Sequence, residues 1–306
     1  MTRAAAHGGR GEAVPAEVLR QVRRIELRTR GLVNSRFTGD YHSVFKGMGM
    51  EFAEVREYQA GDEVRTIDWN VSARMRRLFV KRFVEERELT VLLVVDTSGS
   101  ARGGALERDK QGMAAELAAV LALTATRNND RVGLLLHSDR VEHIVPPRKG
   151  RRHALRLVRD VLAARAQPRG TDLAAACDYA ARLLPHRSIV FVISDFVAPV
   201  YDQALTRLSR RHDVVAVVLD DPSERSLPDV GVARLVDAET GEIAEVDTSD
   251  PRVRRRYDDA VQGERADRRQ LLRRLAVDEV EVPLERGYTE PLLRFFRTRE
   301  TRARRR

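Results

Sequence analysis

The sequence is poor in cysteine and in aromatic residues. Its one cysteine, Cys177, cannot form a disulfide within the chain, so a secreted fold framed by disulfides is excluded. Cys177 lies in an Ala-rich run, Leu173 to Leu184, where we expect a buried structural thiol rather than a reactive one. This indicates a reducing compartment, and we expect the protein to be cytoplasmic.

Long hydrophobic runs are also missing. No stretch reaches the roughly 18 apolar residues that a membrane-spanning helix needs, and the first thirty residues contain arginines but no uncharged apolar stretch. We therefore expect no signal peptide and no membrane anchor. Hydrophobic residues still make up 42% of the 306 residues, which is enough for a globular core.

The charge of the chain is positive but unevenly distributed. Of the formal net charge of +9, the segment Asp250 to Arg306 contributes +6, because it holds 17 arginines against 11 acidic residues. A solvated helical face with a frayed Arg304-Arg305-Arg306 end explains this excess. No basic motif interleaved with aromatic residues accompanies the charge, so an Arg-rich nucleic-acid binder is the least favoured of three functional hypotheses.

From Thr90 onward, apolar strands alternate with helices. Val91 to Val95 is a continuous apolar run that ends in Asp96, as expected of a strand buried on both faces. Further strands are predicted at 132–136, 141–145, 189–193, 214–219 and 279–282, and helices at 109–127, 151–165, 171–184, 201–211, 251–275 and from 290. The alternation predicts an α/β domain with a mostly parallel sheet and helices on both faces.

The pattern divides the chain into four segments. We expect a disordered N-terminus (1–16), an N-terminal appendage (17–87), the sheet domain (88–296) and an Arg-rich C-terminal tail (297–306). Within the appendage, the first residues have the period of an amphipathic helix, 34–46 has no clear period, and 51–86 is charged and irregular or β-rich.

Oxygen-bearing side chains follow the predicted strands at one edge of the sheet. Asp96, Ser98 and Ser100 come directly after the first strand, Thr171 follows a Gly-containing loop, and Asp195 ends another buried strand. Ligands of open α/β sheets bind outside the carboxyl ends of the strands, where these side chains can converge. All five are hard oxygen donors and two are carboxylates, a set that suits Mg²⁺ or Mn²⁺ better than Zn²⁺.

A plainer interpretation is that these residues only terminate strands and cap helices. Ser98 and Ser100 can be turn residues, Thr171 an N-cap and Asp195 a strand-end turn. An Asp-x-Ser-x-Ser string is weak evidence by itself. Its place between a strand and a helix, with Thr171 and Asp195 at two further positions in the right order, favours the metal site.

The same residues resemble the metal-ion-dependent adhesion site of von Willebrand factor A domains. The resemblance covers 91–100, Gly170-Thr171-Asp172-Leu173 and Ile193-Ser194-Asp195-Phe196. It implies a von Willebrand factor A-like fold in which Ser98, Ser100 and Thr171 bind the ion through hydroxyls. Asp96 and Asp195 would bind it directly or through water, and an acidic side chain of a protein partner would complete the coordination.

A second resemblance covers most of the chain. The run from Arg56 to Arg74, REYQAGDEVRTIDWNVSAR, followed by Val80-Lys81, resembles the signature of the bacterial family called domain of unknown function 58. Members of that family carry a von Willebrand-type domain after the signature and often accompany a MoxR-type AAA+ ATPase. Many have membrane helices ahead of the signature, which this chain lacks, and no family enzymatic activity is implied.

The signature surrounds the chain's only tryptophan, Trp69, with alternating arginines and carboxylates. We expect Trp69 and Tyr58 to anchor the segment Arg56 to Arg74 to the sheet domain, because the segment is too short and too charged to bury a core of its own. The alternative is a basic groove that contacts an acidic partner or a phosphate.

Enzymatic chemistry finds little support in the motifs. A metal-dependent phosphohydrolase with Asp96 as nucleophile is the second hypothesis, but the acid expected two residues later is Ser98. Gly-x-Ser-x-Gly and Walker-type motifs are absent, and the histidines show no metal-ligand pairing. We therefore expect a non-catalytic, metal-dependent protein-binding module that acts with an AAA+ ATPase in assembly, maturation or stress handling of a client protein.

Overall fold

The computed structural model describes residues 16–33, 37–45, 50–85, 88–99, 109–164, 170–237 and 240–304. Several sequence expectations concern residues outside these ranges. They include the expectation of disorder before Ala16 and those on Ser100, on most of the loop before Thr171 and on the last two arginines.

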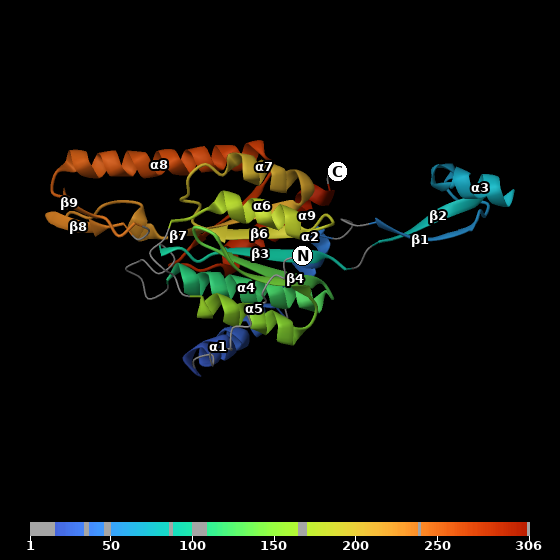
Figure 1. Ribbon diagram of the computed structural model, residues 1–306, viewed down its shortest axis with the longest axis horizontal. Helices are drawn as coiled ribbons and strands as arrows, with labels where there is room; N and C mark the ends of the chain where they lie inside the picture. Colours follow the sequence, from blue (N-terminus) through green and yellow to red (C-terminus); the bar gives the residue numbers. More distant parts are fainter. Residues whose placement is uncertain are drawn as a thin grey trace, which may run out of the picture.

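A six-stranded sheet forms the centre of the molecule (Figure 1). Its strands lie in the order β10-β7-β6-β3-β4-β5, and all neighbours are parallel except β4 and β5. This is the order of a doubly wound fold, in which the first and fourth strands along the chain, here β3 and β6, are neighbours where the winding reverses. The strands are β3 (Thr90–Asp96), β4 (Arg131–His137), β5 (Val141–Arg148), β6 (Ile189–Ser194), β7 (Asp213–Asp220) and β10 (Asp278–Pro283).

Helices cover both faces of this sheet, so the predicted α/β fold is confirmed (Figure 1). One face packs against α4 (Lys110–Arg127), α5 (Arg151–Ala163) and α9 (Thr289–Arg304). The other packs against α6 (Leu173–Leu183), α7 (Asp202–Arg211) and α8 (Pro251–Arg274). In β3, Leu93 belongs to the first core and Leu92 to the second, as expected of a strand buried on both sides. Within the described residues, no helix is both long and apolar enough to cross a membrane.

Two N-terminal helices belong to the main body. They are α1 (Ala16–Leu32) and α2 (Thr38–Phe45). Phe37, Tyr41 and Phe45 are buried, and each places its ring 6.0–6.3 Å from that of Phe296 in α9. This spacing of four residues is a helical signal, although no clear period is expected for 34–46 from the sequence. The helix forms because the aromatic stripe has a partner in α9.

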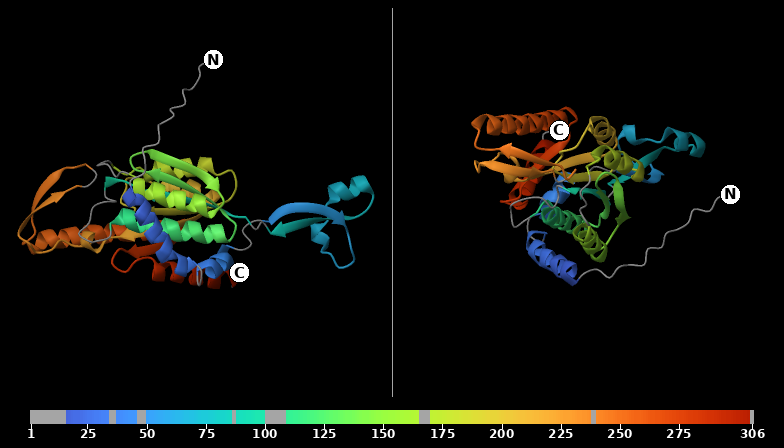
Figure 2. Two further views of the ribbon diagram at one scale, coloured as in Figure 1. Left: turned by 90° about the horizontal axis from the view of Figure 1, so that it is seen from below. Right: turned by 60° about the vertical axis from the view of Figure 1, so that its left-hand side comes forward.

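The family signature lies in an arm (residues 50–85) that stands away from the main body (Figures 1 and 2). The arm consists of the antiparallel strands β1 (Met50–Glu57) and β2 (Phe79–Glu85), with η2 (Val64–Thr66) and α3 (Trp69–Met75) between them. The expectation that Trp69 anchors this segment to the sheet domain is wrong, because Trp69 is 64% exposed. The arm is instead held by its own backbone pairing and by Asp68, which caps α3 through Asn70 N and Val71 N.

A second hairpin, the ribbon (residues 232–247), lies at the opposite end of the molecule from the arm (Figure 1). Its strands are β8 (Val232–Val236) and β9 (Ile243–Asp247), and α8 follows it. The arginines of α8 do not form only a solvated face, since the side chain of Arg268 is 9% exposed and pairs with Glu279 and Glu281 of β10. Residues 297–304, assigned above to a tail, belong to α9.

One buried carboxylate connects the N-terminal helices to the sheet domain. Asp130 precedes β4 and accepts hydrogen bonds from Tyr41 Oη at 3.0 Å and from Leu89 N at 2.9 Å. Burial raises the pKa of Asp130 to about 6, more than these two donors lower it. Because the pKa is higher in the folded than in the unfolded chain, ionisation of Asp130 costs stability above pH 6 and not below pH 4.

We predict that Asp130→Asn removes this pH dependence. Asn has the same shape and can still form hydrogen bonds with both partners. The wild type should therefore gain about 3 kcal/mol of stability over the variant when the pH is lowered from 7 to 4, because only the wild type avoids the cost of ionising residue 130 at the lower pH. Urea unfolding at both pH values measures the difference, with Asp259→Asn on the exposed side of α8 as the control. Identical pH profiles for wild type and Asp130→Asn would contradict the prediction.

Candidate functional site

The switch point between β3 and β6 carries two of the predicted site residues. Asp96 is the last residue of β3, and Asp195 directly follows β6. Ser194 Oγ donates to Asp96 Oδ2 at 2.7 Å, and Ser98 N donates to Asp96 Oδ1 at 2.9 Å. Both Asp96 and Ser98 are buried. The strand order that sequence alternation predicts therefore brings these residues to the edge where ligands of doubly wound sheets bind.

Thr171 reaches the same edge through the neighbouring strand β4. Asp96 lies opposite His137 in the β3–β4 pairing, and Thr97 N and Oγ1 donate to the His137 carbonyl at 2.8 and 2.9 Å. The next residue, Ser138, accepts a bond from Asp172 N at 2.7 Å, which holds the start of α6 at the end of β4. Thr171 itself is buried there.

The N-cap of α6 is Asp172 rather than Thr171. The Asp172 side chain accepts from Ala175 N at 2.8 Å. The plainer interpretation of Thr171 as the capping residue is therefore wrong. The structure places four predicted residues, Asp96, Ser98, Thr171 and Asp195, at one edge of the sheet, and Ser100 lies outside the described residues.

A lysine that the sequence analysis does not single out is part of this site. Lys110, the first residue of α4, is 2% exposed. Its Nζ donates to Asp195 Oδ2 and to Glu224 Oε1, both at 2.7 Å. Although burial works against the ammonium, the two carboxylates raise the pKa of Lys110 above its usual value. The one feature of the sequence that could have indicated this role is the position of Lys110 in the first turn of the helix that follows the Asp96 loop.

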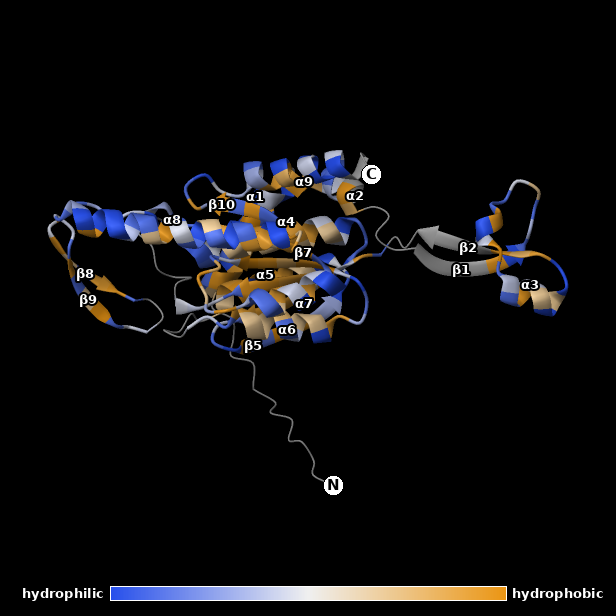
Figure 3. Ribbon diagram, turned by 90° about the horizontal axis from the view of Figure 1, so that it is seen from above, coloured by the Kyte–Doolittle hydropathy of each residue, from blue (hydrophilic) through white to orange (hydrophobic). Residues whose placement is uncertain are grey.

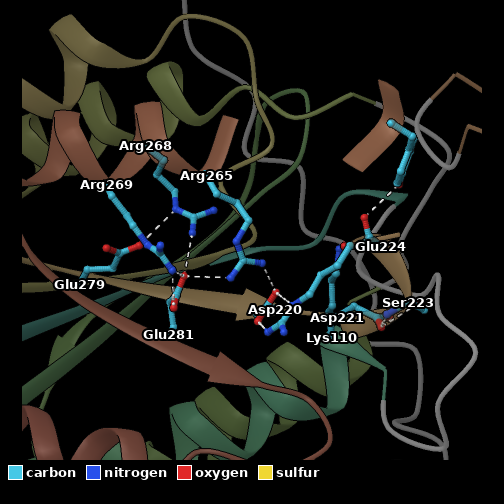
Figure 4. Close-up of polar contacts among 12 residues, drawn as sticks. Lys110, Asp220, Asp221, Ser223, Glu224, Arg265, Arg268, Arg269, Glu279 and Glu281 are labelled. Carbon is cyan, nitrogen blue, oxygen red and sulfur yellow. Dashed lines mark hydrogen bonds and ion pairs between the residues drawn. The ribbon is translucent and has the colours of Figure 1, made fainter. Parts of the chain in front are cut away.

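Two carboxylates follow next along this edge, and the first of them also has cationic partners (Figure 4). Asp220, at the end of β7, pairs with Arg225 and with Arg265 of α8. Although burial opposes ionisation, hydrogen bonds from these two arginines keep the pKa of Asp220 below its usual value. Asp221 caps the short helix η4 (Pro222–Glu224), which carries the Glu224 partner of Lys110.

Asp96 differs from Asp195 and Asp220 in the kind of partner it has. Asp221, like Asp96, accepts only from neutral groups among the described residues, Ser223 N and Oγ. In the described part of the chain the hydrogen bonds of Asp96 come from a backbone amide and a serine hydroxyl, which carry no charge. No group of three or more His, Cys, Asp or Glu side chains that could hold a metal occurs among the described residues. A cation at this edge would therefore depend on hydroxyl oxygens together with Asp96 and Asp195.

The doubly wound sheet, with its antiparallel edge strand and with hydroxyl and carboxylate side chains at the switch point, defines a von Willebrand factor A-like α/β domain. Residues 54–267 match the family described as Protein of unknown function DUF58, and the chain belongs to this family. The match begins within the arm and extends into α8.

Relatives occur in mycobacteria. An uncharacterized protein of Mycobacterium tuberculosis is 31% identical over 293 residues, which is 95% of this chain and 92% of the relative. An uncharacterized protein of Mycobacterium avium is 32% identical over 158 residues, covering 51% of this chain and 93% of the relative.

Similar solved structures include the conserved hypothetical protein BatB from Bacteroides thetaiotaomicron. It is 15% identical with a TM-score of 0.46, and the match covers 70% of this chain and 99% of BatB. The VWA domain of SpRpn10 is 12% identical with a TM-score of 0.37, over 67% of this chain and 94% of that domain.

We predict that Lys110→Met destabilises the protein by about 3 kcal/mol, because it leaves Asp195 buried without its ammonium partner. Lys149→Met is the matched control, since Lys149 pairs with Glu88 in a more exposed position and should cost at most about 1 kcal/mol. Urea unfolding of both variants measures the two effects. Equal stability of the two variants would show that the Lys110 contacts are not a significant source of stability.

Proposed function

We propose that this protein is a non-catalytic, metal-dependent protein-binding module, and that Mg²⁺ or Mn²⁺ binds at the edge formed by β3, β6 and the start of α6. The observation that carries the proposal is the environment of Asp96. This carboxylate is 6% exposed, and its partners in the described part of the chain are neutral. Buried charges are normally paired or bound to a metal, so a cation is the expected complement of Asp96.

The remaining donors fit such an ion. Ser98, Ser100 and Thr171 supply hydroxyl oxygens and Asp195 a second carboxylate, a set of hard oxygens of the kind that Mg²⁺ prefers. Lys110 affects the strength of binding, because it already compensates the charge of Asp195. A divalent ion would therefore share or displace this ammonium, and we expect its affinity to be moderate.

The partner that suits this site is an acidic protein surface. An ion held by hydroxyls and by only two carboxylates, one of them already paired with Lys110, keeps positive charge for an incoming carboxylate. The resemblance to the family called domain of unknown function 58 suggests a MoxR-type AAA+ ATPase as the partner, in assembly, maturation or stress handling of a client. The buried free thiol of Cys177 is compatible with work in the cytoplasm.

The surroundings of Asp96 also favour binding over catalysis. Both of its oxygens accept hydrogen bonds, and Ser98 occupies the position where a phosphohydrolase would place its acid. Phosphate release from a phosphomonoester that depended on Asp96 would instead support the phosphohydrolase alternative.

We predict that Mg²⁺ or Mn²⁺ raises the Tm of the wild type and not of Asp96→Asn, which removes the charge and keeps the shape. At an ion concentration about tenfold above Kd, linkage gives about 1.4 kcal/mol, or a Tm rise of about 3 °C. Asp259→Asn should respond like the wild type. If calorimetry detects no binding of either ion at millimolar concentration, the metal site is refuted.

The partner is tested separately. An immobilised MoxR-type ATPase should retain the wild type and Asp259→Asn and should lose Asp96→Asn by at least about tenfold in Kd. A chelator alone is not sufficient here, because the ATPase needs its own Mg²⁺ for nucleotide binding. If the immobilised ATPase retained the wild type and Asp96→Asn equally, the partner would not bind through the metal site.

A further inference from the structure

The ribbon exposes one face that nothing in the described structure covers. Side chains alternate along β8 and β9, and the register places Val236 opposite Ile243 and Val232 opposite Asp247 on the same face. Val232, Val236 and Ile243 are 70%, 63% and 55% exposed. Figure 3 shows the hydrophobic colouring of both strands beside the hydrophilic α8. The same face also carries Arg234, Glu245 and Asp247, so it combines exposed apolar side chains with charged ones, as a binding surface does.

The ribbon is also strongly acidic. Between Val232 and Asp247 the sequence holds five carboxylates and a single basic residue, Arg234. Arg234 lies directly opposite Glu245, so the one arginine stands beside a carboxylate of its own hairpin. A partner for this face must therefore combine apolar side chains with positive charge.

The outer part of the arm has this combination. From Val64 to Leu78 it carries four arginines and one acidic residue, Asp68, whose carboxylate caps α3. Val64, Trp69, Met75 and Leu78 are all exposed. Arg77 pairs with Glu57, whereas Arg65, Arg74 and Arg76 are exposed and have no ion-pair partner among the described residues.

We propose that the arm of one copy of this chain docks on the ribbon of another copy, with Trp69 as the apolar anchor and the arm arginines facing the ribbon carboxylates. The two surfaces are complementary in charge and both expose apolar side chains. They project from opposite ends of the molecule, so one chain cannot close the contact on itself (Figures 1 and 2). A second copy supplies the missing surface without requiring any other protein.

This contact is heterologous, because each copy uses one surface as donor and a different surface as acceptor. Such contacts produce open chains of molecules or closed rings rather than a two-fold dimer. The arm supplies only one short helix and a turn, so a weak interface is expected, and part of its strength is electrostatic and depends on salt. This inference is independent of the metal site.

The test is sedimentation equilibrium of the full chain and of two variants. The weight-average mass of the wild type should rise above 34.6 kDa with concentration and continue past that of two chains, and added salt should reduce it. Trp69→Ser removes the anchor and Ile243→Asp places a charge on the ribbon face. Each change should weaken association by at least about tenfold, the effect of losing an interface anchor.

Mixing the two variants gives the decisive observation. Each variant alone lacks one surface, but Ile243→Asp keeps an intact arm and Trp69→Ser keeps an intact ribbon. An equimolar mixture should form pairs of chains and nothing larger. Leu27→Ser, which changes an exposed leucine on α1, should associate like the wild type, and circular dichroism should show that all three variants remain folded.

Two outcomes overturn the proposal. A wild type that stays at the mass of one chain at every concentration would mean that these surfaces do not bind each other and are available to a different protein. A mixture of the two variants that forms no pairs, although the wild type associates, would place self-association on other surfaces.

Discussion

A carboxylate buried at the carboxyl end of a strand needs a partner that replaces its lost hydration. This requirement determines which side chains gather along the carboxyl ends of the sheet's strands. Asp195 has the ammonium of Lys110, and Asp220 has the guanidinium groups of Arg225 and Arg265. Glu281 draws Arg265, Arg268 and Arg269 of α8 onto β10. Asp96 and Asp221 are the exceptions, since their hydrogen-bond partners in the described chain are neutral. This rule fixes α4 and α8 against the sheet, and it is the physical basis of the cation proposed at Asp96.

The sheet could be predicted from sequence because its central strands β3, β4, β6 and β7 are continuous apolar runs and each is next to an α-helix along the chain. The edge where Asp96, Thr171 and Asp195 lie follows from this, since the carboxyl ends of parallel strands share one edge. Lys110 could not be predicted in the same way. It meets Asp195 across 85 positions of sequence, and only the packing of α4 against the sheet brings the long side chain to the carboxylate.

The position of the arm was also beyond the reach of the sequence pattern. A lone tryptophan among charged residues fits an anchor as well as an exposed contact, because hydrophobicity alone does not say which surface will cover it. In the arm, Ile67 and Val80 form a small core of their own, and Trp69 remains outside it. The helix α2 could not be predicted for the opposite reason, since the partners of its aromatic residues, among them Phe191 and Phe296, lie about 150 to 250 residues later in the chain.

The arm enters and leaves the main body at one place, because Met50 pairs with Glu85 at the base of the hairpin. The arm is thus an insertion into the main body, and the two ends of this insertion lie next to each other. Closing a loop of this length costs little more entropy than closing a short one, so α2 and β3 can pack whatever sequence lies between them. The body and the arm are therefore free to diverge separately, and the same sheet scaffold can be combined with arms of different length.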